Sequence, residues 1–171
     1  MKPDQVETAY KTDMPMGQLS TVEALIVTSF RLWAAPHREP EATHPVWKTG
    51  LHVAGVAPWG LHAFDTLLWV TLASGAYPLD VRCHTSTKLG RDEAHLLKML
   101  AMCQAGTIND GVMPLSLWMP CFAAQTALVH LQLFAVALCN AGLSIDPVIR
   151  EARNPNHSSQ LGQKPTPHTL H

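Results

Sequence analysis

The sequence predicts an all-α protein: a single-domain helical bundle with a long, uncharged central helix and extended proline-rich loops. Three observations lead to this prediction. Apolar residues recur at helical spacing in separate stretches, and a chain of 171 residues suits one domain. No Asp, Glu, Lys or Arg occurs from residue 111 to residue 145. We expect the helical domain to occupy residues 20–150, between a flexible N-terminal arm at 1–19 and a C-terminal tail at 151–171 that is disordered or bound to a partner.

The first helix is predicted over residues 21–34. Ser20 and Glu23 have the spacing of a capping box, in which each side chain accepts a hydrogen bond from an otherwise unpaired amide at a helix start. Apolar residues then recur at helical spacing until Pro36, where we expect the helix to stop. Four prolines lie within 36–58, which predicts a long ordered loop that contains one turn of helix.

Two further helices are predicted at 59–74 and 91–104. In the first of these, an apolar stripe of Leu61, Phe64, Leu68 and Leu72 indicates the face that packs on the core. The helix at 91–104 begins with acidic residues, which the helix dipole favours there, and Gly106 is placed to cap its end. Residues 79–89 between them alternate as an extended segment would, although a surface loop explains them equally well.

The central helix is predicted over 115–141, with a bend at Pro120. Its length and lack of charge would suit a membrane span. Its polar residues Gln125, His130 and Gln132 would be costly in hydrocarbon. A core helix that is buried nearly all round is therefore the better interpretation, and a membrane-associated subunit stays open as an alternative.

The composition favours association with other protein. Charged residues make up only 15% of the chain, against about a quarter in ordinary domains. A chain with so little solvating charge hides surface, so we expect a homo-oligomer or a subunit of a larger complex. The net charge of −1 shows no excess of basic residues, which argues against a nucleic-acid-binding protein.

We expect a cytoplasmic location. The N-terminus has no basic stretch followed by an apolar one, so it does not read as a secretory signal. The four cysteines lack Cys-x-x-Cys spacing and are expected to be free thiols. Motifs of nucleotide-binding loops, serine hydrolases and zincin proteases are absent from the sequence.

Histidines paired with carboxylates are the main candidates for chemistry in this histidine-rich chain. His62 and Asp65 lie one helical turn apart, as do Asp92 and His95, and His84 lies between the two helices. Helical bundles build metal sites from such pairs. The sequence thus predicts a site for a divalent transition metal, with the candidate ligands His62, Asp65, His84, Asp92 and His95.

Asp65 is singled out because it is the sole charged residue between Thr49 and Leu79, on a helix expected to be largely covered. A buried carboxylate must be paired, coordinated or protonated. If the protein is an enzyme, His62, Asp65 and His84 are the predicted catalytic residues.

Simpler interpretations compete with this site. Asp65 could form an ion pair with Lys48 or Arg82, and Asp92 could merely stabilise the start of its helix. Three functions therefore stay open: a small metal- or cofactor-binding helical protein that could be an enzyme, a non-catalytic assembly or partner-binding protein, and a membrane-associated subunit.

Overall fold

The computed structural model describes residues 10–75, 77–108 and 112–145. Within them the chain forms a short 3-10 helix and six α-helices, which confirms the all-α, single-domain prediction. Their bounds are η1 (Met16–Gln18), α2 (Thr21–Arg38), α3 (Lys48–Val53), α4 (Pro58–Ser74), α5 (Arg91–Gln104), α6 (Val112–Leu115) and α7 (Cys121–Asn140). The predicted tail at 151–171 lies outside the described residues.

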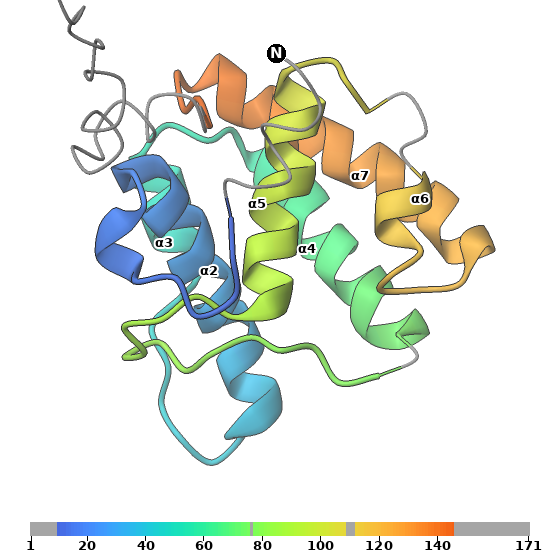
Figure 1. The fold of residues 1–171 in the computed structure, drawn as a ribbon. Helices are drawn as coiled ribbons and strands as arrows, with labels where there is room; N and C mark the ends of the chain where they lie inside the picture. Colours follow the sequence, from blue (N-terminus) through green and yellow to red (C-terminus); the bar gives the residue numbers. More distant parts are fainter. Residues whose placement is uncertain (1–9, 76, 109–111, 146–171) are drawn as a thin grey trace, which may run out of the picture.

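The core is formed by α2, α4, α5 and α7, each of which contributes buried apolar side chains. Figure 1 shows α5 in front of α4 and α7, with α2 and α3 to one side and the short α6 beside α7. The helix pair with the most extensive contact is α4 and α7. At their crossing a Cβ on Gly60 would lie 2.2 Å from the Cβ of Ala137, so only glycine permits this approach. Phe64 and Phe134 stack in the interface, with ring centroids 4.4 Å apart.

Helix α2 starts where the sequence predicts and ends later. The capping box is present: Ser20 Oγ accepts from the Glu23 amide at 3.2 Å, and Glu23 Oε2 accepts from the Ser20 amide at 2.7 Å. Pro36 does not stop the helix, which continues to Arg38. Pro36 lies in the last turn of α2, so the one amide donor that it lacks is missing only near the helix end. Arg38 stabilises this end by donating to the carbonyls of Val81 and Arg82.

Residues 10–19, predicted as part of a flexible arm, are packed on the domain. Tyr10 is buried and donates to Glu23 Oε1 at 2.5 Å. The segment also pairs with the loop before α5 through an isolated bridge between Pro15 and Lys88. No strand forms in the described part of the chain, so residues 79–89 are the loop that the sequence left as an alternative.

The predicted central helix is shorter than expected and has one open side. A separate helix, α6, precedes α7, and Pro120 stands at the N-terminus of α7 instead of bending it. Proline is suited to a helix start because it has no amide to leave unpaired. The expectation of burial nearly all round is wrong: Ala124, Leu131 and Phe134 are buried, but Phe122 and Val129 on the opposite side are 75% and 53% exposed. Helix α7 is also long and apolar enough to cross a membrane by length and composition.

Candidate functional site

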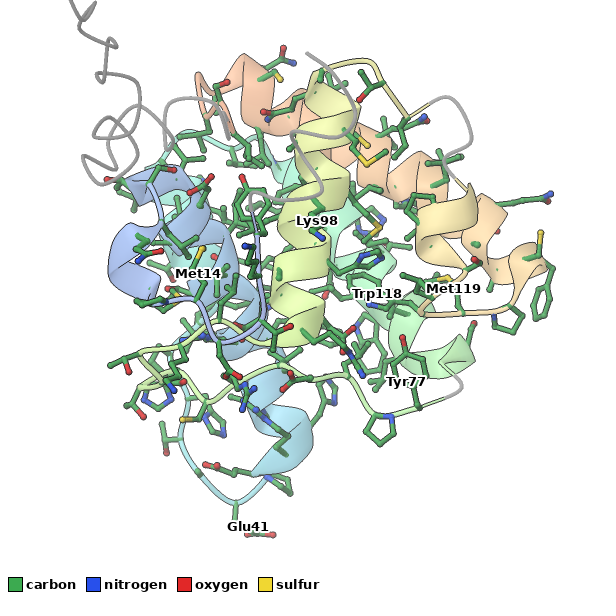
Figure 2. All side chains as sticks on the ribbon, viewed as in Figure 1. Met14, Glu41, Tyr77, Lys98, Trp118 and Met119 are labelled. Carbon is green, nitrogen blue, oxygen red and sulfur yellow. The ribbon has the colours of Figure 1, made fainter. Side chains whose placement is uncertain are left out.

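A cavity of about 400 Å³ lies beside α5 and is the best candidate site in the described residues. We call it the α5 cavity. Figure 2 shows Lys98 on α5, with Trp118 and Tyr77 on the side of α5 that faces α6. The cavity is lined by Thr12, Tyr77, Arg91, Asp92, His95, Lys98 and Leu117.

Helix α5 supplies the charged side chains and the imidazole of this cavity. Arg91, His95 and Lys98 are spaced by four and three residues, which places them on one helix face. The helix itself is anchored through Glu93, which is fully buried. Its carboxylate receives Arg31 Nε at 2.7 Å and Arg31 Nη2 at 2.8 Å, together with the amides of Arg82 and Gly90. A buried ion pair with every donor satisfied fixes the start of α5 and hence the floor of the cavity.

Asp92 forms that floor and is completely engaged. Its carboxylate accepts from the Trp118 indole at 2.9 Å, from the Asp80 amide at 2.6 Å and from Arg91 Nη2 at 2.9 Å. Burial raises the pKa of Asp92, but the hydrogen bonds from Arg91, Asp80 and Trp118 outweigh burial, and the pKa lies below its ordinary value. Asp92 is therefore a charged structural acceptor, with its oxygens already used.

His95 is held as a neutral imidazole. Its Nε2 lies 2.8 Å from the carbonyl oxygen of Pro114, which can only accept, so Nε2 carries the proton and Nδ1 bears the lone pair. Burial lowers the pKa of His95, against the opposing effects of the Pro114 carbonyl and Asp92. The ring meets the Trp118 ring edge to face at 5.3 Å between centroids, which fixes its orientation. His95 therefore lines the cavity as an imidazole with its proton on Nε2.

The rim of the cavity is positively charged. Arg91 is shared between Asp92 and the ring of Tyr77, whose centroid lies 5.0 Å from the guanidinium carbon. Tyr77 donates its hydroxyl proton to the carbonyl of Leu117. Lys98 pairs with no carboxylate in the ranges that the structure describes, so its charge is available to a ligand.

The predicted site residues do not come together. Asp92 and His95 meet at the α5 cavity, whereas His62 and His84 are exposed elsewhere. His62 lies near His130 of α7. Burial is the larger cause of the lowered pKa of His130, and electrostatic repulsion from His62 is the smaller one. Throughout residues 10–75, 77–108 and 112–145, no group of three or more His, Cys, Asp or Glu side chains is placed to hold a metal ion.

Asp65 is not the buried, unpaired acid that its surroundings suggested. Its side chain is 26% exposed and lies 3.8 Å from Lys48, the ion pair that the sequence offered as the simpler interpretation. Asp65 Oδ1 also accepts from the Trp33 indole at 2.8 Å. Trp33 in turn packs edge to face on Trp69 at 5.6 Å between centroids. Asp65 therefore orients Trp33, a tryptophan of the core that is only 5% exposed.

Sequence reasoning missed most of the cavity. The 4-and-3 spacing of Arg91, His95 and Lys98 was a usable signal, since it predicts one face with two cations and an imidazole. Tyr77 and Thr12 reach the cavity from distant loops, and no local pattern marks them.

No protein-family model matches this chain, and no curated protein or solved structure shows significant similarity to it.

Proposed function

We propose that this protein binds a small organic anion or anionic cofactor in the α5 cavity. The observation that carries the proposal is the unpaired Lys98 beside the neutral His95 at a cavity of about 400 Å³. Cavities of this size hold small ligands and use a few polar groups to orient them.

The charges of the lining select an anion. Arg91 and Lys98 carry positive charges, and Asp92 carries a negative charge that pairs with Arg91 at 2.9 Å, so the lining has a net positive charge and Lys98 is its unpaired cation among the described residues. A carboxylate or phosphate can therefore take Lys98 as its counter-ion, and Arg91 offers further N–H donors. The Nδ1 lone pair of His95 suits a hydroxyl or N–H donor on the same ligand. The rings and methyl groups of Tyr77 and Leu117 suit an apolar part.

A metal is not part of this proposal. The carboxylate of Asp92 is fully engaged, and two cations at the cavity would repel a divalent ion. We also propose a cytoplasmic location, which the four free cysteines support.

The test is a thermal-shift screen at constant ionic strength, followed by titration calorimetry. The probes are inorganic phosphate, citrate, short mono- and dicarboxylates and nucleoside monophosphates. A true ligand at 100 times its Kd should stabilise the protein by about 2.7 kcal/mol. Lys98→Met should abolish the shift, and Lys88→Met, which removes an exposed lysine outside the cavity, should retain it. Absence of any shift at millimolar concentrations, or equal binding by Lys98→Met, would overturn the proposal.

A further inference from the structure

The open side of α7 is a continuous uncharged strip. We define the α7 strip by its exposed residues Cys121, Phe122, Gln125, Thr126, Val129, Gln132, Leu133, Val136, Cys139 and Asn140. Phe122, Val129, Val136 and Leu133 expose 75%, 53%, 51% and 42% of their area. Helix α5, by contrast, exposes Arg91 and half-exposes Lys98. A strip without charge along a whole helix is not an ordinary solvated face, and it indicates a contact with another surface.

The spacing of the strip suits another helix. Phe122, Val129 and Val136 are seven residues apart, which is the repeat of a seam between two packed helices. Because the strip has no charge, a second identical strip meets it without repulsion.

A groove opens at the C-terminal end of the strip. It has a volume of about 490 Å³ and lies between α7 and the end of α5, with Gln132, Val136 and Cys139 on one wall and Cys103, Gly106 and Ile108 on the other. Burial raises the pKa of the Cys103 thiol to about 12, so this wall is uncharged as well. Phe122, the most exposed ring of the strip, lies at the other end, roughly 21 Å away along the helix at 1.5 Å per residue.

From this arrangement we infer that α7 is the contact between two copies of the chain, packed antiparallel about a two-fold axis at Val129. Phe122 and Val136 lie seven residues on either side of Val129. In an antiparallel pair, each Phe122 therefore reaches the partner's groove beside Val136, and both grooves fill at once. Such a self-complementary contact closes at two subunits. A parallel pair would place the two Phe122 rings together and leave both grooves empty.

A second copy explains the strip better than a lipid surface does. Gln125, Gln132 and Asn140 carry amides, which hydrocarbon leaves unpaired and which the amides or hydroxyls of a second strip can pair. The strip is about 30 Å long and about 10 Å wide, from helix dimensions. Each partner of a standard interface buries about 800 Å². The contact is smaller, so we expect a dimer that dissociates in the micromolar range.

The first test is sedimentation equilibrium of the full chain in detergent-free buffer, from about 1 to about 200 µM, a range that brackets a micromolar Kd. The wild type should pass from monomer to dimer, and Phe122→Glu should stay monomeric with an unchanged circular dichroism spectrum. Val53→Glu is the matched control: Val53 is 81% exposed on α3, away from the strip, and its variant should dimerise like the wild type. A wild type that is monomeric at every concentration, or soluble only in detergent, would overturn the inference.

A photo-crosslinker at position 122 tests the direction of packing. The variant carries benzoylphenylalanine there, is mixed with nitrogen-15-labelled chain, and its crosslinks are mapped by mass spectrometry. The inference requires intermolecular crosslinks to the groove around Val136 and Cys139. Crosslinks to the partner's residues near 122 would show a parallel pair, and crosslinks within one chain to residues 146–171 would show that the tail covers the strip. Either result would overturn it. These readouts do not depend on the α5 cavity, so the two proposals fail separately.

Discussion

Two histidine–aspartate pairs with the same sequence spacing have different environments in this molecule. His62 and Asp65 on α4 lie one turn apart, as do Asp92 and His95 on α5, and in each pair the acid accepts from a tryptophan indole, at 2.8 Å from Trp33 and at 2.9 Å from Trp118. The α4 pair leaves His62 exposed and Asp65 partly exposed. The α5 pair buries Asp92 and places His95 on a cavity. What surrounds a pair, not its spacing, decides whether it lines a cavity.

Replacing the aspartate of each pair by alanine should give the largest difference in the free energy of unfolding. We expect Asp92→Ala to lower the free energy of unfolding by about 3 kcal/mol, since the buried Trp118 indole and Asp80 amide lose their acceptor. Asp65→Ala should cost about 1 kcal/mol, because water can replace the partly exposed carboxylate. Urea unfolding of both variants measures this. Equal losses would show that the two environments are energetically alike, and Asp92→Asn, which keeps an acceptor oxygen, should lose less than Asp92→Ala.

The pH dependence of stability should reveal the buried imidazole of His95. Burial lowers the pKa of His95 in the folded protein below the value of about 6.5 of an unfolded histidine. The unfolded chain then binds the proton more readily, so stability is full above about pH 6.5 and declines as the pH falls toward the folded pKa. Each unit of pKa difference corresponds to about 1.4 kcal/mol.

Urea unfolding of His95→Gln at pH 7.5, 6.5 and 5.5 measures that contribution. The variant should lose less stability over this range than the wild type does. His84→Gln, in an exposed loop, serves as the control and should follow the wild type. A His95→Gln profile that coincides with the wild-type profile would contradict a buried neutral imidazole.

The hydrogen bond from the Trp33 indole to Asp65 should stabilise the protein more than the ion pair between Lys48 and Asp65 does. Trp33→Phe keeps an aromatic ring against Trp69 and removes the hydrogen bond to Asp65. We expect a loss of about 1 to 2 kcal/mol in the free energy of unfolding, from the hydrogen bond and from the smaller ring at a core position that is only 5% exposed. The double variant Trp33→Phe with Asp65→Ala should lose less than the sum of the two single losses, since both single variants remove the same hydrogen bond. Fully additive losses would show that the bond contributes nothing.

Local patterns were sufficient to predict most of the helices. The capping box at Ser20, the apolar stripe of α4 and the acidic start of α5 each depend on residues within one or two turns. Gly106, predicted to cap α5, has the positive φ of 66° that such a cap requires. The helix end predicted from Pro36 was wrong because a proline in the last turn costs little. The end of α2 is set by the contacts of Arg38 with a distant loop.

The site was harder to predict because its partners are distant in sequence. The metal hypothesis assumed that His62, Asp65, His84, Asp92 and His95 converge, and the structure places only Asp92 and His95 at one cavity. Asp65 accepts a hydrogen bond from Trp33, 32 residues away, and Glu93 accepts one from Arg31, 62 residues away. Such pairs are decided by helix packing, which the spacing of residues along one helix does not determine.

The smallest expected effect concerns the ion pair between Lys48 and Asp65. Its atoms are 3.8 Å apart and the Lys48 side chain is 47% exposed, so solvent and salt screen the attraction. We expect Lys48→Met to change the free energy of unfolding by less than about 0.5 kcal/mol, and the change should vanish at 0.5 M NaCl. Urea unfolding at low and high salt measures both. A loss of 1 kcal/mol or more would mean that Lys48, not Trp33, holds Asp65 in place, and the α4 pair would then resemble the charge-anchored α5 pair more closely than its exposure suggests.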